Sequence, residues 1–119
     1  MTSIWIGKAK ELTLTALADE QVRLEHKIKE LDEEARSYPG YENPDDAAAI
    51  RMLDGEIKGY RKMLKQLKVK TDELMAKFRE IEKLDDELDE AARVRDDNDE
   101  RMIRGEIDGR MKELGFTRR

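Results

Sequence analysis

Residues 50–92 of the chain read IRMLDGEIKGYRKMLKQLKVKTDELMAKFREIEKLDDELDEAA. Apolar and aromatic side chains recur in this stretch at alternating steps of three and four residues, and they fill eleven of thirteen such positions. A repeat of about 3.5 residues places these side chains along one face of a coiled-coil helix. The spacing therefore predicts a continuous helix over residues 45–92, roughly 70 Å long at ~1.5 Å per residue. The positions of this apolar seam are Ile50, Leu53, Ile57, Tyr60, Leu64, Leu67, Thr71, Leu74, Phe78, Ile81, Asp85, Leu88 and Ala92.

A first helix is predicted over residues 3–37, where apolar residues recur with a similar period. A loop is predicted over residues 38–44, which contain both prolines of the chain. Asn43 as the N-cap and Pro44 as the first helical residue are typical of a helix start, so the long helix begins at the end of this loop. The seam of the first helix consists of Leu14, Leu17, Gln21, Leu24, Ile28, Leu31 and Ala35.

The two halves of the chain resemble each other at an offset of 50 residues. The sequence RMLDGEIKG at residues 51–59 recurs as RMIRGEIDG at residues 101–109. Both glycines recur although helices disfavour glycine, which favours an internal duplication of a helical hairpin over chance similarity among charged helices. The recurring glycines also predict close packing against another helix, with partner binding as the alternative. They are Gly55, Gly59, Gly105 and Gly109.

The same offset predicts where the chain turns. Fifty residues are seven heptads plus one residue, so Ile103 and Ile107 are out of phase with the seam of the long helix. One straight helix could not present both sets to a single partner, and residues 96–99 (DDND) are typical of turns and N-caps. We therefore predict a turn over residues 93–97 and a last helix over residues 98–114 that folds back along the long helix.

These elements predict an all-α fold of elongated antiparallel helical hairpins, or a coiled coil, built round one long central helix. The fold forms a single domain over residues 1–119. A cross-section of two helices leaves much of an apolar seam in contact with water, and a second copy of the chain would cover it. We therefore expect a homodimer or a higher oligomer, with another protein as a further partner.

The composition excludes several classes of protein. Charged residues make up 45% and aromatic residues 5% of the chain, as in long solvent-exposed helices. Without cysteine there is neither a disulfide framework nor a thiolate metal site. No run of ~18 apolar residues is present, and the run at residues 4–6 is too short for the core of a signal peptide. We therefore expect a cytoplasmic protein without a membrane partner.

The charges are distributed unevenly along the long helix. Residues 57–71 contain six basic residues and no acid, whereas residues 80–100 contain eleven acids and three basic residues. The basic residues fall at several heptad positions, which predicts that they surround the helix. Ion pairing, with acids such as Glu20 and Glu25 of the first helix or with a second subunit, is favoured over nucleic-acid binding. The candidate partner-binding residues of this stretch are Lys58, Arg61, Lys62, Lys65 and Lys68.

Two single residues also suggest contacts. Trp5 is the sole tryptophan and lies off the seam of the first helix. A tryptophan in such a position is typical of an anchor that docks a partner, and burial against the far end of the long helix is the alternative. Asp85 lies within the seam of the long helix. Because a lone buried charge is costly, we expect Asp85 to be paired or to face solvent, and to set the register of packing.

Few residues in the sequence are typical of catalysis or metal binding. His26, the sole histidine, falls outside the seam. Carboxylate pairs such as Glu30 and Glu33 resemble the E-x-x-E motifs of MazG-type nucleotide pyrophosphohydrolases, but their heptad positions direct them outward. Residues 96–107 begin like a calcium loop and lack its glycine and its last acid. We therefore assign no catalytic, cofactor-binding or metal-binding residue and expect a protein that is not an enzyme.

The G-E-I-x-G blocks, followed by a basic residue and a leucine on a short acidic helical chain, resemble small phage-encoded virion or accessory proteins. The resemblance implies a location in the virion or the host cytoplasm, and no functional residue is carried over from it. The sequence favours a non-enzymatic interaction protein that acts as an oligomeric scaffold, adaptor or inhibitor. The alternatives are a nucleic-acid-associated protein that uses residues 58–70 and a metal-dependent nucleotide hydrolase of the MazG type.

Overall fold

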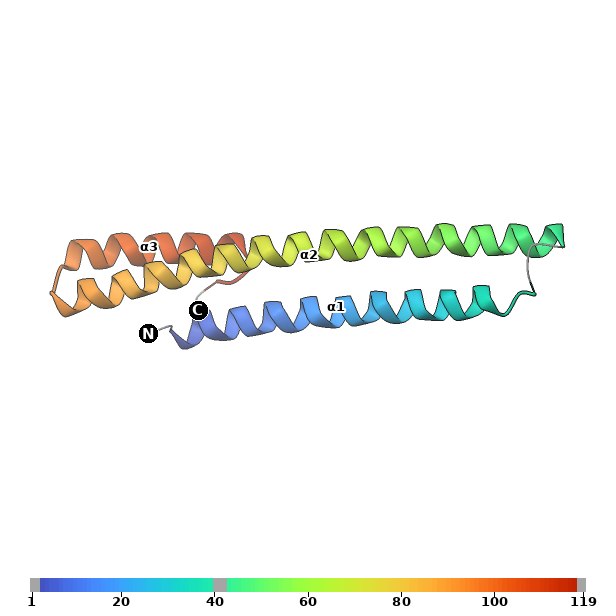
Figure 1. Cartoon of the computed structure of the whole chain (residues 1–119). Helices are drawn as coiled ribbons and strands as arrows, with labels where there is room; N and C mark the ends of the chain where they lie inside the picture. Colours follow the sequence, from blue (N-terminus) through green and yellow to red (C-terminus); the bar gives the residue numbers. More distant parts are fainter. Residues whose placement is uncertain (1–2, 40–42, 118–119) are drawn as a thin grey trace. The chain divides into compact units, whose positions relative to one another are not determined.

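The computed structural model of the protein describes residues 3–39 and 43–117. In order along the chain, α1 spans Ile4–Arg36, α2 spans Pro44–Arg93 and α3 spans Asp97–Glu113 (Figure 1). No strand occurs within the described ranges. The structure confirms an all-α fold of helical hairpins built round one long central helix, and each helix begins and ends within one residue of the expected position.

Local signals start the second and third helices. The side chain of Asn43 accepts a hydrogen bond from the backbone N–H of Asp45 at 3.0 Å. The side chain of Asp96 accepts one from the N–H of Asp99 at 3.1 Å. Each bond satisfies an N–H group that has no partner inside its helix, and acids in the first turn of both helices complement the helix dipole.

The turn between α2 and α3 ends α2 with a Schellman motif. The N–H of Asp96 donates to the carbonyl of Ala91 at 3.0 Å, and the N–H of Arg95 donates to that of Ala92 at 3.2 Å. This motif requires a left-handed residue at its centre, and Arg95 takes that conformation with φ of 58°. The same motif ends α3, where Gly115 supplies the left-handed residue with φ of 91°.

Contacts between the helices divide the chain into two compact units. Unit 1 consists of Met1–Leu14 and Asp72–Arg119, and unit 2 consists of residues 15–71. In unit 1 the start of α1, the end of α2 and the whole of α3 form a bundle of three helices. Its buried cluster, whose side chains are exposed by 0–2%, consists of Ile6, Ala9, Phe78, Ile81, Ile107 and Met111.

The predicted return of the last helix is confirmed in unit 1. Ile107 and Met111 lie in the buried cluster with Phe78 and Ile81, and Ile103 and Leu114 pack against it. The chain turns between Arg93 and Asp97, as the phase difference between the two repeats requires.

Unit 2 is a hairpin of two antiparallel helices, the rest of α1 and the first part of α2 (Figure 1). Its buried cluster consists of three residues, Leu31, Leu53 and Ile57, which are exposed by 5–8%. Ile28, Ala35, Tyr38 and Tyr60 pack against this cluster and are only half-buried. Two helices therefore shield their seam less completely than the three helices of unit 1.

Burial along α2 follows the predicted seam, since every position from Ile50 to Leu88 is buried or half-buried. The last position is a correction: Ala92 is exposed and Ala91 is buried instead. The reason is that α1 begins opposite Asp85, so the final turns of α2 have only α3 to pack against. The side of α2 that faces α3 there differs from the side that faces α1.

The predicted seam of α1 also needs a correction in its first half. Leu14 and Gln21 are exposed, whereas Thr13 and Glu20 are half-buried. Counted back from Leu24, the less exposed positions follow the 3.6-residue period of an α-helix and pass through Glu20 and Thr13. A strict heptad has a period of 3.5 residues and therefore points to Gln21 and Leu14 instead. The other predicted positions, which are buried or half-buried, are Leu17, Leu24, Ile28, Leu31 and Ala35.

Candidate functional site

The five candidate cations of residues 57–71 all lie on α2 within unit 2, and all are exposed. They are spaced by three, four and seven residues, and a helix turns by about 100° per residue, so they share one arc of about 120°. The expectation that the cations surround the helix is therefore wrong; of the six, only Lys70 lies on another side. We call this surface the basic face of α2. It consists of Lys58, Arg61, Lys62, Lys65 and Lys68.

Among the described residues, no acid compensates the basic face. Glu20 pairs instead with Arg23 at 2.6 Å, and Glu25 accepts a hydrogen bond from Gln21 at 3.0 Å. Within residues 3–39 and 43–117, no carboxylate lies within ion-pair distance of the five cations. The expected intramolecular ion pairs with α1 are therefore not formed, because the α1 acids pair with neighbours on their own helix.

The contact between Glu20 and Arg23 also affects their titration. The hydrogen bond from Arg23 lowers the pKa of the Glu20 carboxyl, and the same bond raises the pKa of Arg23. Both groups therefore remain charged at neutral pH and hold each other on α1, away from the basic face.

One exposed apolar residue lies within the basic face. Val69 falls inside the arc of the five cations and is 57% exposed. The basic face therefore offers both positive charge and an apolar contact along about 15 Å of helix.

A groove of about 330 Å³ lies on the flank of unit 2 away from the basic face. It runs beside the half-buried seam and is lined by Lys27, Glu56, Gly59, Tyr60 and Met63. Met63 is 50% exposed there, and Met52 on the same side of α2 is 70% exposed. We call this the apolar groove.

The helical glycines do not serve packing within the chain. A Cβ atom added at Gly55, Gly59, Gly105 or Gly109 would meet nothing within 4 Å. The predicted close packing at these positions is therefore absent from each unit, and partner binding remains a prediction. The two copies of the repeat otherwise behave alike, since Ile57 and Ile107 are both buried.

Trp5 packs against the buried cluster of unit 1 and is half-buried. That cluster contains Phe78 and Ile81 of α2, so the packing of Trp5 agrees with the alternative of burial against the far end of α2, although Trp5 is only half-buried. A docking role for Trp5 remains a prediction.

Asp85 is buried in unit 1 and is paired, as expected for a carboxylate in the seam. Its carboxylate accepts a hydrogen bond from the backbone N–H of Ser3 at 2.7 Å. The hydroxyl of Ser3 in turn accepts from the N–H of Ile6 at 3.4 Å. Asp85 therefore places a negative charge at the N-terminus of α1, where the helix dipole favours it.

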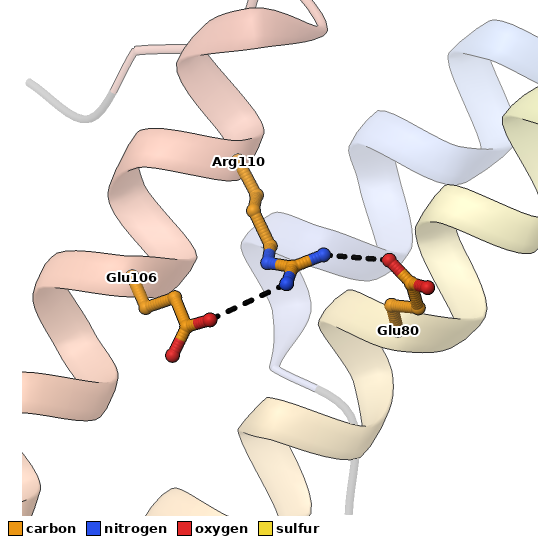
Figure 2. Close-up of polar contacts among 3 residues, drawn as sticks. All are labelled: Glu80, Glu106 and Arg110. Atoms are coloured by element: carbon orange, nitrogen blue, oxygen red, sulfur yellow. Dashed lines mark hydrogen bonds and ion pairs between the residues drawn. The ribbon is translucent and has the colours of Figure 1, made fainter.

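Several acids of residues 80–100 are used inside unit 1. Figure 2 shows Arg110 of α3 reaching Glu80 of α2 at 2.6 Å and Glu106 at 3.3 Å. The hydrogen bond with Glu80, and then that with Glu106, raises the pKa of Arg110. Glu82 similarly pairs with Lys10 of α1 at 2.8 Å. These pairs, of which that between Lys10 and Glu82 is part-buried, connect the three helices, although water screens them.

Three further acids of residues 80–100 lie where α2 meets α3. A groove of about 310 Å³ in unit 1 is lined by Glu87, Glu90, Ala91, Val94, Asp99 and Ile103. The lining combines three carboxylates with apolar side chains, of which Val94 is 65% exposed. We call this the acidic groove. Sequence reasoning located the acidic block but not this groove, because the groove exists only once α3 has folded back onto α2.

Residues considered for metal binding do not converge. Among the described residues, no group of three or more His, Asp or Glu side chains is arranged to hold a metal ion. His26 is exposed and lies 3.1 Å from Glu30 on the same helix. In the described part of the chain, no helix has the length and apolar character needed to cross a membrane.

Comparison of the chain with protein-family models, with curated proteins and with solved structures gave no match.

Proposed function

We propose that the chain is a non-enzymatic helical interaction protein that assembles with copies of itself and presents surfaces to another protein. The observation that carries this proposal is the unequal shielding of the two units. In unit 1, α3 completes a three-helix bundle around six buried residues. In unit 2, two helices bury a connected cluster of only three, and Leu24, Ala47 and Ile50 are buried outside that cluster.

A further helix would complete unit 2 in the way that α3 completes unit 1. Tyr60, Leu64 and Leu67 of the seam are half-buried, and the apolar groove runs beside them with Met63 exposed. Gly59 leaves room in that groove for close approach of a backbone. Burial of apolar surface is the main favourable term in association, at about 25 cal/mol per Å².

A scaffold, adaptor or inhibitor is the role that fits such a protein. The resemblance of the G-E-I-x-G blocks to small phage proteins supports a phage origin as part of the proposal. A location in the host cytoplasm or the virion belongs to the same proposal.

The experiment is light scattering coupled to size-exclusion chromatography at micromolar concentration. We expect a mass of at least two chains for the wild type, and a lower mass for Met63→Glu, since the charge falls in the apolar groove. Met63 is half exposed, so the variant can solvate its charge and fold. Val22→Glu is the matched control, because Val22 is an exposed apolar residue on the outer side of α1 in the same unit. A mass of 13.9 kDa for the wild type would refute self-assembly.

Binding of nucleic acid is a second candidate function, supported by the five exposed cations of the basic face. Phosphate contacts by these cations would make binding strongly dependent on salt. Fluorescence anisotropy with labelled duplex DNA and single-stranded RNA tests this candidate. Tight binding that Lys62→Glu/Lys65→Glu abolishes would support it, and absence of binding at about 50 mM salt would exclude it.

A further inference from the structure

The basic face is not explained by the stability of α2. Its cations stand three and four residues apart, so their side chains are neighbours of like charge, and such pairs destabilise a helix. No acid in the described part of the chain lies within ion-pair distance to offset this repulsion. A partner of opposite charge would remove it, so the composition of the face indicates a docking surface.

The α2 carboxylates of the acidic groove are likewise not explained by the stability of the helix on which they lie. Glu90 lies in the last turn of α2, where the helix dipole disfavours a carboxylate. Within the described residues, Glu90 pairs with Arg93, one turn along the same helix, and Glu87 has no partner. The helix end therefore gains nothing from Glu87, and only the pair with Arg93 offsets the unfavourable position of Glu90.

The two surfaces also match in their apolar parts. The basic face contains exposed Val69 within the arc of its cations, and the acidic groove contains exposed Val94 together with its carboxylates. Each surface thus combines charges of one sign with an apolar contact, and the two signs are opposite. Protein interfaces commonly have this composition, with a polar rim around an apolar centre.

We propose that the basic face of α2 in one copy of this chain binds the acidic groove of a second copy. The inference rests on the proposed self-assembly and adds a second contact between copies, separate from the apolar groove of unit 2. A second copy is favoured over a nucleic acid because the whole chain carries a net charge of −5, which repels a polyanion, while the second copy supplies its acids in one groove. The contact joins unlike surfaces, so it either closes into a symmetric pair with two such contacts or continues from copy to copy.

Complementary charge reversal tests the proposal. The first variant, Lys62→Glu/Lys65→Glu, makes the basic face acidic and keeps the acidic groove. The second variant, Glu87→Lys/Glu90→Lys, makes the groove basic and keeps the basic face. We expect each variant alone to associate at least about tenfold more weakly than the wild type, and an equimolar mixture to recover most of the wild-type mass.

The matched control is Lys29→Glu/Lys70→Glu, which changes the net charge equally at two exposed cations outside the basic face. We expect this control to keep the wild-type mass at the same salt concentration. Circular dichroism establishes that each variant is as helical as the wild type, and Lys62→Gln/Lys65→Gln replaces the first variant if the reversal unfolds it.

The outcomes separate the two proposals. A monomeric wild type would overturn both self-assembly and this contact. A wild-type oligomer whose mass neither variant changes, or whose mass the mixture fails to restore, would overturn only the contact between the basic face and the acidic groove. Loss of binding to DNA or RNA by the first variant, with no change in its mass, would assign the basic face to nucleic acid instead.

Discussion

Asp85 is buried and paired in unit 1. The pairing could be predicted from the sequence, but the partner could not. A carboxylate between Ile81 and Leu88 in an apolar seam had to be paired, because an isolated buried charge is costly. The sequence could not name the partner, since Ser3 is 82 residues away and its N–H group becomes available only where α1 begins. The contact joins α1 and α2 at one defined level and so acts on the register of unit 1.

Asp85→Ala should lower the free energy of unfolding by about 1–3 kcal/mol, because the N–H of Ser3 loses its acceptor in a part-buried place. Urea unfolding followed by circular dichroism measures the change. Asp85→Asn keeps an acceptor of nearly the same shape and should cost less. An alanine variant as stable as the wild type would show that the hydrogen bond does not matter to the fold.

Within the described ranges, Arg95 is the one residue other than glycine with a left-handed backbone conformation. It adopts φ of 58° in the turn after α2, whereas the equivalent position after α3 is Gly115. A left-handed conformation costs a residue with a Cβ roughly 1–2 kcal/mol. Arg95→Gly should therefore raise the unfolding free energy by about 1 kcal/mol, and Gly115→Ala should lower it by a similar amount. Thermal unfolding of both variants tests the pair, and a destabilised Arg95→Gly would show that the arginine side chain itself contributes.

At the scale of the elements, the helices could be predicted because their signals are local. The N-cap at Asn43, the proline after it and the acids around Asp96 marked helix starts that the structure reproduces. The offset of the repeat predicted the turn before α3. The boundary between the two units could not be predicted, because it depends on where α1 and α3 begin relative to α2 and not on any local signal.

Phe78→Ala should lower the unfolding free energy by about 3–5 kcal/mol, because the ring is 0% exposed at the centre of the three-helix bundle. Met102→Ala is the control, since Met102 lies in the same unit with an exposed side chain. Denaturant unfolding of the two variants gives the comparison. Similar values for both would mean that the assigned core of unit 1 is wrong.

Gly105→Ala should raise the unfolding free energy by about 0.5–1 kcal/mol, because alanine favours a helix and its Cβ meets nothing within 4 Å. The measurement is thermal unfolding at a concentration at which the wild type and the variant have the same mass. A destabilised variant would indicate that a second molecule already packs against this glycine.

At the scale of the whole molecule, the uneven distribution of charge was visible in the sequence, but its consequences were not. Counting residues could not tell that Glu80 and Glu82 are used by Arg110 and Lys10, while Glu87 is left without a partner among the described residues. The spacing of the five cations already implies that they share one side of α2, although their heptad positions suggested otherwise. The acidic groove, in contrast, emerged only from the folded geometry.

Self-association should weaken as salt is added. Raising the ionic strength from about 0.1 M to about 1 M shortens the Debye length from about 10 Å to about 3 Å, which screens the basic face from the acidic groove. We expect the dissociation constant to rise at least about tenfold over this range, as measured by light scattering. Association that strengthens with salt would indicate that apolar contacts alone hold the copies together.

Self-assembly through the incompletely shielded unit 2 is the central claim, and sedimentation equilibrium of the wild-type chain tests it most directly. The measurement covers concentrations from the low micromolar range upward at about 0.1 M salt, where screening is moderate. The account predicts a mass of at least twice the 13.9 kDa of one chain, falling toward that value on dilution. A mass of 13.9 kDa at every concentration would contradict it.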